Sequence, residues 1–167
     1  EENTLSDFEK LREADVPILE SLPKTMTEGL AQVARLGRAL GDLSDAAKDR
    51  VRDAYAITRR AEEIARAPAI VRAFVAVWME PWMTVNDETF VASVLRHAGA
   101  ENVFADRVRR FPLAADIGRA KEVSRERAEG RDQRYPRVSL EEIRERAPAL
   151  VLLPDEPYVF TPQDGPE

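Results

Sequence analysis

Helical and extended patterns alternate over the first 41 residues. Apolar residues at helical spacing predict a short helix with Asn3 as its N-cap; they are Leu5, Phe8 and Leu11. The apolar run at 16–19 predicts a strand. Because Pro17 has no backbone N–H, either the strand lies at a sheet edge or the proline is at the start of the strand. Residues 25–28 match a capping box that opens a helix, which Gly41 ends. The apolar stripe of this second helix consists of Leu30, Val33, Ala34, Gly37 and Leu40.

A longer helix is predicted from Ser44 to about Ala67, where Pro68 ends it. Its roughly 24 residues would span about 36 Å. Its apolar seam is narrow and rich in alanine, and consists of Ala47, Val51, Ala54, Ile57, Ala61, Ile64 and Ala65. So thin a seam favours light contact with other elements, as in a helix that bridges two lobes, although a surface helix of one domain fits nearly as well.

The remaining chain predicts two buried strands, at 70–78 and 149–153, with helices between them. Asn86 or Asp87 is the expected N-cap of a helix that Gly99 ends, lined by Phe90, Val91, Val94, Leu95 and Ala98. Residues 105–137 are irregular and charged, and the mixture of six basic and four acidic residues within 119–134 indicates a solvated excursion or a short exposed helix. Ser139 opens a second capping box, with Val138 and Ile143 placed as a hydrophobic staple. Residues 154–167 are expected to form a loop. Strand and helix alternation predicts an α/β fold with parallel sheets.

Composition excludes several functional classes. The formal net charge of -6 gives no basic field for nucleic acid or anionic lipid. The absence of cysteine excludes disulfides and thiolate chemistry, and a single histidine excludes a multi-histidine metal site. No apolar run reaches the roughly 20 residues of a membrane helix, and no glycine-rich phosphate loop or nucleophile elbow occurs. The chain starts at Glu1 without a signal segment, which we interpret as a processed or truncated product.

Two predicted strands end in aromatic, proline-containing loops, at 78–83 and 154–160. Loops at the carboxyl ends of parallel strands meet at one edge of the sheet and commonly bind ligands. Trp78 and Trp82 lie in the first loop and Tyr158 in the second. Such rings suit a large planar or lipophilic ligand. The alternative is that they close the core at the strand ends.

Three carboxylates share these loops: Glu80, Asp155 and Glu156. They admit three interpretations, namely acid–base catalysis, solvated loop charges, and contacts with arginines of a partner protein. His97, the single histidine, is expected to lie on the surface of its helix or to pack against a neighbour rather than to bind a metal.

Several stretches together resemble the helical-backbone solute-binding proteins of ABC importers, the receptors for ferric siderophores, haem and cobalamin. They are LGRALG at 36–41 with the long helix after it, VWMEPW at 77–82, TFV at 89–91, LRHAGAENVF at 95–104, RVSLEEI at 137–143 and APALVLLP at 147–154. The resemblance implies two Rossmann-like α/β lobes linked by one long helix. Residues 1–43 would be the remnant of the first lobe, 44–67 the interlobe helix, and 68–167 a second lobe without its C-terminal part.

The resemblance also implies a function and a site. Such a receptor is not an enzyme and has no resident cofactor or metal; it captures its ligand between the lobes and delivers it to a membrane permease. It would be periplasmic or extracytoplasmic, with or without a lipid anchor. Trp82 would lie on the cleft wall, with Trp78, Tyr158 and Glu80 beside it, and Glu156 would dock the permease.

The chain departs from the family pattern because strands at its start and helices at its end are missing, so half of the ligand site would be absent. Two other functions stay open. One is a small hydrolase that uses Glu80 and Glu156. The other is a helical interaction module built around residues 44–67.

Overall fold

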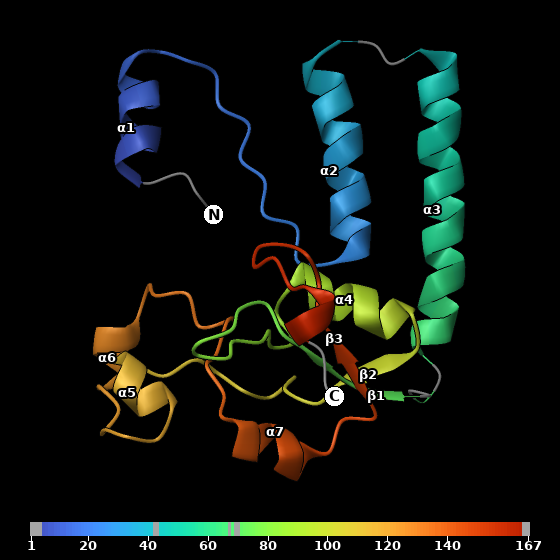
Figure 1. The fold of residues 1–167 in the computed structure, drawn as a ribbon. Helices are drawn as coiled ribbons and strands as arrows, with labels where there is room; N and C mark the ends of the chain where they lie inside the picture. Colours follow the sequence, from blue (N-terminus) through green and yellow to red (C-terminus); the bar gives the residue numbers. More distant parts are fainter. Residues whose placement is uncertain (1–4, 42–43, 67, 69–70, 165–167) are drawn as a thin grey trace.

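The computed structural model describes residues 5–41, 44–66, 68 and 71–164. Figure 1 shows a small sheet packed with helices, from which a pair of long helices projects. The elements in chain order are α1 (Leu5–Glu13), α2 (Met26–Ala39), α3 (Asp45–Ala65), β1 (Val71–Val75), α4 (Phe90–His97), β2 (Ala100–Asn102), α5 (Leu113–Asp116), α6 (Arg125–Ala128), α7 (Leu140–Arg146), β3 (Leu150–Leu152) and a 3-10 turn (Pro162–Asp164).

The three strands form a parallel sheet in the order β2-β1-β3. Val71 pairs with Ala100 on one side of β1, and Ala73 pairs with Leu150 on the other. Parallel neighbours need a crossover, which α4 supplies between β1 and β2, and the long segment ending in α7 supplies between β2 and β3. The predicted α/β class with a parallel sheet is therefore confirmed.

Alternate residues of β1 and of the two positions that follow it build two separate halves of the core. Ala73, Val75 and Val77 pack with Val85, Leu95 and Ala100 on the face that α4 covers. Phe74 and Ala76 point to the opposite face, where they pack with Val103, Phe104, Val138 and Phe160. Central strand β1 is thus buried on both faces, as its nearly continuous apolar sequence predicts.

The helices α2 and α3 lie side by side and extend away from the sheet (Figure 1). Polar contacts hold the sheet-proximal end of this pair: Thr27 Oγ1 donates to Glu62 Oε1 at 2.6 Å, and the Met26 amide donates to Ser93 Oγ of α4 at 3.1 Å. A long helix is confirmed between Ser44 and Ala67. Its role as a link between two lobes, and the domain division at residues 43 and 67, remain predictions.

The predicted strand at 16–19 is wrong. These residues form an irregular segment between α1 and α2, where Val16 is 45% exposed and Ile18 38% exposed. A strand is stable only when a neighbour takes its backbone hydrogen bonds, and no described strand pairs with this segment.

Two predicted helix faces are also incorrect in part. On α3, Ile57 is 68% exposed, whereas its neighbour Thr58 is buried at 4%. The seam therefore passes through Thr58, and the side chains of Ile64 and Ala65 lie outside the described residues. On α2 only Gly37 is fully buried, while Val33 and Leu40 are exposed.

Two smaller predictions are corrected in the sheet domain. The N-cap of α4 is Thr89, whose hydroxyl accepts from the Ala92 amide at 3.2 Å, and not Asn86 or Asp87. Asn86 instead accepts from the Glu88 amide in the preceding turn. Strand β3 was expected to be buried, yet Leu150 and Val151 are 39% and 41% exposed because β3 is an edge strand.

Candidate ligand-binding site

The loop after β1 is a tight turn whose two sides are hydrogen bonded to each other. The Met83 amide donates to the Trp78 carbonyl, and the Val77 amide donates to the Met83 carbonyl, each at 2.9 Å. The Val138 amide donates to the Trp82 carbonyl at 3.0 Å, which attaches the segment before α7 to the outer side of this turn. Trp78 and Trp82 are therefore placed by backbone hydrogen bonds rather than carried on a free loop.

Aromatic rings from the two strand-end loops form a continuous series. Trp78 meets Tyr158 edge to face, with ring centroids 5.2 Å apart, and Tyr158 lies 4.7 Å from Phe160. Phe160 stacks on Trp82 at 6.1 Å with an interplanar angle of 9°. The series runs from the surface, where Trp78 is 43% exposed, to the core, where Phe74 is 2% exposed and lies 6.4 Å from Trp82.

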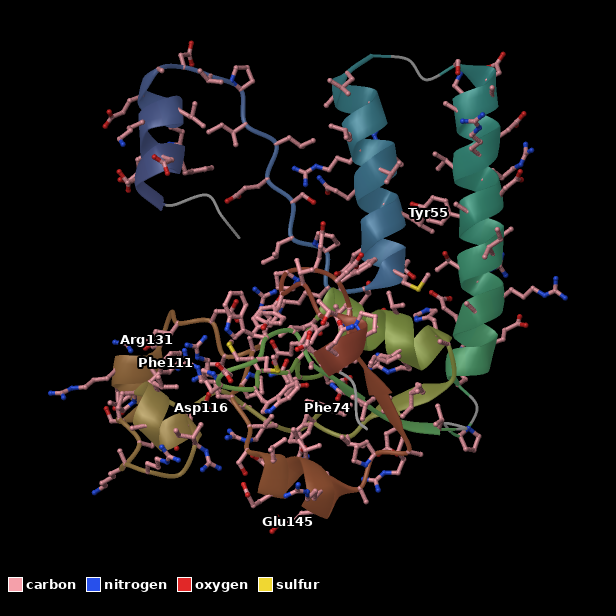
Figure 2. The ribbon with its side chains drawn as sticks, in the orientation of Figure 1. Tyr55, Phe74, Phe111, Asp116, Arg131 and Glu145 are labelled. Carbon is pink, nitrogen blue, oxygen red and sulfur yellow. The ribbon has the colours of Figure 1, made fainter. Side chains whose placement is uncertain are left out.

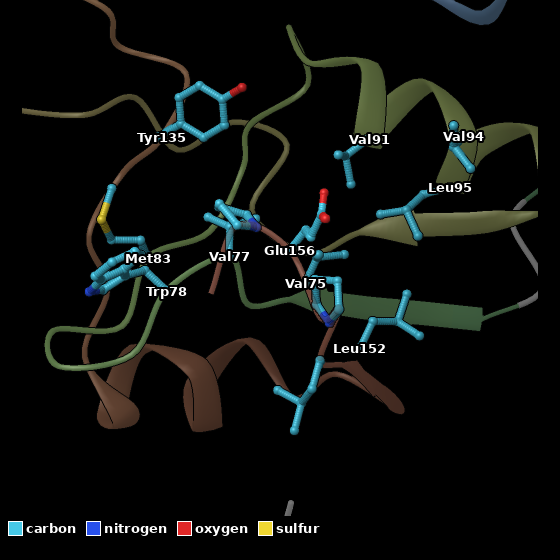
Figure 3. A pocket seen from close by; sticks show the side chains of 13 residues that line it. Val75, Val77, Trp78, Met83, Val91, Val94, Leu95, Tyr135, Leu152 and Glu156 are labelled. Carbon is cyan, nitrogen blue, oxygen red and sulfur yellow. The ribbon is translucent and has the colours of Figure 1, made fainter. Parts of the chain in front are cut away.

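An open apolar cavity of about 810 Å³ lies between this corner, β3 and α4 (Figure 3). Its floor is formed by residues of the core face under α4, such as Val75, Leu95 and Leu152. Val91 and Val94 of α4 form one wall. The lining also includes Glu156, whose carboxylate points toward Val91 in Figure 3, and the phenol ring of Tyr135. A cavity of this size and character fits an apolar ligand group of moderate size.

The structure brings together only part of the predicted ligand set. Of the four predicted ligand residues only Trp78 lines the cavity, whereas Trp82 is half-buried and packs against the core cluster on the other face of the sheet. Glu156, which was predicted to dock the permease, lines the cavity as well. Tyr158 touches Trp78 and is half-buried against that same cluster. Glu80 lies exposed in the turn, outside the cavity lining, and its φ of 61° puts it in the left-handed region.

The three loop carboxylates do not converge on one point. Asp155 and Glu156 are exposed in the second loop, and neither Glu80 nor Asp155 lines the cavity with Glu156. His97 is half-buried near the end of α4, where Nδ1 lies 2.6 Å from the Ser93 carbonyl oxygen. Histidine, cysteine and carboxylate side chains form no group of three that could hold a metal ion within the described residues.

Sequence reasoning missed two features of this region. One is the cavity wall on α4, which a clue could have revealed, because the helix carries apolar residues on two faces: Ala92 and Leu95 are buried while Val91 and Val94 face the cavity. The other is Tyr135, which lies in the segment described as irregular and charged and has no neighbouring periodicity to mark it.

A buried ion pair was also missed in that charged segment. The side chains of Arg107 and Asp116 are 8% and 0% exposed, and Nη1 lies 3.2 Å from Oδ1. Arg107 also donates from Nε to Glu142 Oε1 at 3.0 Å, and Asp116 accepts from the amides of Arg110 and Arg137. The charged segment is therefore attached to α7 by an internal polar network, although its composition is typical of a solvated surface.

Comparison with known proteins supports the fold. No family model matches the sequence, and a search of the curated proteins found no match. Among solved structures, the periplasmic vitamin B12 binding protein BtuF of Vibrio cholerae is similar with a TM-score of 0.62 and 19% identity over 90% of this chain. A possible iron-binding, periplasmic solute-binding protein of Staphylococcus epidermidis ATCC 12228 is similar with a TM-score of 0.55 and 14% identity, again over 90% of this chain. The present chain covers 49% and 50% of those two chains, so it spans about half their length.

Within the described residues, no helix is both long and apolar enough to cross a membrane.

Proposed function

We propose that this chain is part of a solute-binding protein of an ABC importer, a non-catalytic receptor that captures a ferric siderophore, haem or a cobalamin-type ligand. The observation that carries the proposal is the extent of the fold similarity: 90% of the chain aligns with two binding proteins, one named for vitamin B12 and one described as possibly iron-binding. The family-like segments in the sequence support the same function independently.

The arrangement at the carboxyl ends of β1 and β3 supports a ligand wall. Trp78 offers a partly exposed ring that Tyr158 supports from the side. The adjoining cavity exposes core side chains, which need a cover to be removed from water. A planar or lipophilic ligand provides such a cover.

The remaining expectations for this receptor follow from the same proposal. The site residues are Trp78, Trp82, Tyr158 and Glu80, of which Trp78 has the placement that best fits contact with a ligand. The exposed Glu156 is the proposed contact with a permease arginine. The proposed location is periplasmic or extracytoplasmic, with or without a lipid anchor.

Equilibrium dialysis of the chain against haem, cyanocobalamin and a ferric catecholate chelate tests the proposal. We expect one of the three to bind, and Trp78→Ala to weaken that binding at least about tenfold, since a buried aromatic contact contributes about 1.5 kcal/mol or more. Val159→Ala is the matched control, because Val159 is 70% exposed and lies outside the cavity lining. Equal affinity in the wild type and Trp78→Ala would place the ligand elsewhere and reject this wall.

A further inference from the structure

The segment 105–137 has a charge opposite to that of the whole chain. It contains ten basic and six acidic residues, a net charge of +4, whereas the chain carries -6. Because the rest of the molecule is acidic, this local excess of arginine is not explained by a general basic surface. The hydrogen bonds and ion pairs that each guanidinium makes therefore indicate whether the segment has a binding role.

Two of these arginines lie over one aromatic ring. The guanidinium carbons of Arg109 and Arg131 are 5.1 and 5.0 Å from the centroid of the Phe111 ring. Figure 2 shows Phe111 and Arg131 close together beside α5 and α6, at the far end of the sheet domain from α3. Contact with the ring holds the two planar cations in defined positions while leaving their N–H edges free to donate.

Arg109 and Arg137 each keep an unused donor. The Nε atoms of both side chains are buried and have no hydrogen-bond partner, and neither guanidinium makes an ion pair within the described part of the chain. The backbone of each is fixed: the Arg109 amide donates to the Gln133 carbonyl at 3.0 Å, and the Arg137 amide donates to Asp116 Oδ2 at 2.7 Å. A buried N–H without an acceptor costs free energy that a suitable ligand would recover.

The neighbouring carboxylates are already occupied. Asp132 binds the Arg134 guanidinium through Nε and Nη2, at 2.9 and 2.7 Å. The hydrogen bond from Arg134 holds the pKa of Asp132 below its usual range, so Asp132 stays charged and engaged. Asp116 is shared between Arg107 and two backbone amides.

The positive charge of Arg137 is not fully balanced by nearby carboxylates. Loss of solvent, together with the nearby positive charge of Arg109, lowers the pKa of Arg137, and Asp116 opposes this shift only in part. Two cations that repel each other while partly removed from water are stabilised by an anion between them.

We propose that Arg109, Arg131 and Arg137 form a binding site for a small anion that carries several carboxylate or phosphate oxygens. Such an anion would accept from the unused Nε–H groups and neutralise the excess charge, in the forked geometry that guanidinium favours. None of the three arginines lines the apolar cavity, so this inference does not rest on the proposed function.

Titration with pyrophosphate and with citrate tests the proposal, followed by calorimetry and by the Arg Nε–H resonances in ¹⁵N-correlated NMR spectra. We expect the Nε–H signals of Arg109 and Arg137 to shift, and Arg109→Gln/Arg137→Gln to weaken binding at least about tenfold through loss of charge-assisted hydrogen bonds. Arg59→Gln/Arg60→Gln is the matched control, since it removes the same charge from exposed positions of α3.

Three results would overturn the proposal: no binding of either anion, unchanged Nε–H signals at saturation, or an equal loss in the α3 control. If the double Gln variant fails to fold by circular dichroism, Arg109→Lys/Arg137→Lys keeps the charge but removes the Nε–H donors, and the same tenfold loss is expected. Vesicles with and without phosphatidylglycerol distinguish the source of the anion: arginine-dependent binding to the anionic vesicles alone assigns the site to lipid headgroup phosphates.

Discussion

At the scale of single residues, Arg107 and Asp116 show how a charged sequence can build an interior. Asp116 accepts from three groups, and Arg107 donates to Glu142 and to backbone carbonyls, so both charges are fully engaged despite their burial. An isolated buried charge would cost several kcal/mol, and here the geometry offsets that cost. The pair fixes where the segment 105–137 leaves the core and where it returns to it.

Asp116→Asn tests this role. The amide nitrogen cannot accept from a backbone amide, and the buried Arg107 loses its fully buried counterion and keeps only the partly exposed Glu142, so we expect a loss of about 3 kcal/mol in unfolding free energy. Urea denaturation measures it. Asp132→Asn changes the more exposed pair with Arg134 and should cost at most about 1 kcal/mol. Similar costs for both variants would contradict a special role for the buried pair.

Ala147 offers a prediction of the opposite sign. It is the C-cap of α7 and has φ 44°, in the left-handed region where a Cβ is unfavourable. Ala147→Gly should therefore raise the unfolding free energy by about 1 kcal/mol. Ala56→Gly, at an exposed position inside α3, should lower it by a similar amount, because glycine is unfavourable within a helix. Thermal denaturation of the two variants should give shifts of opposite direction.

At the scale of elements, some predictions from the sequence pattern are confirmed and others are wrong. The capping box of α2 forms as predicted, with Thr25 accepting from the Glu28 amide and Glu28 accepting from the Thr25 amide. The strand predicted at 16–19 fails because strand formation requires a partner that local sequence cannot supply. The N-cap of α4 was misplaced by two or three residues, since Asn86 caps a turn instead and Thr89 caps the helix.

The α2 capping box gives a test at this scale. Thr25→Ala removes the acceptor for the Glu28 amide, and we expect a loss of about 1 kcal/mol in unfolding free energy. Thr25→Ser should restore most of it because the hydroxyl is kept. The comparison by denaturant titration would contradict the assignment if Ser and Ala at this position were equally destabilising.

At the scale of the whole molecule, stability is concentrated in the sheet domain. Both core clusters belong to residues 71–160, whereas α1 and the segment 14–24 expose Leu11, Val16 and Leu22. The candidate ligand-binding site also lies within the residues that form the core. Sequence placed the two aromatic loops correctly at strand ends, but which indole faces outward depends on packing: Phe160 stacks on Trp82 and leaves Trp78 beside the cavity. The sequence pattern alone does not determine which of the two indoles is exposed.

Hydrogen exchange measured by mass spectrometry tests this distribution. Peptides from 71–77 and 92–104 should exchange slowest, those from α2 and α3 faster, and those from α1 and 14–24 fastest, since exchange follows the free energy of local opening. Protection of α1 equal to that of β1 would contradict the account, because it would require contacts that hold α1 as firmly as the core.

The central claim is that the corner carrying Trp78 faces a ligand, and tryptophan fluorescence tests it most directly. Trp82→Phe leaves Trp78 as the single indole, and Trp78→Phe leaves Trp82. Titration of both variants with haem, cyanocobalamin and a ferric chelate, corrected for absorbance with free N-acetyltryptophanamide, compares the two positions. The account predicts saturable quenching by one of these ligands that is stronger for Trp78 than for Trp82. Absence of saturable quenching of Trp78 by all three would contradict it.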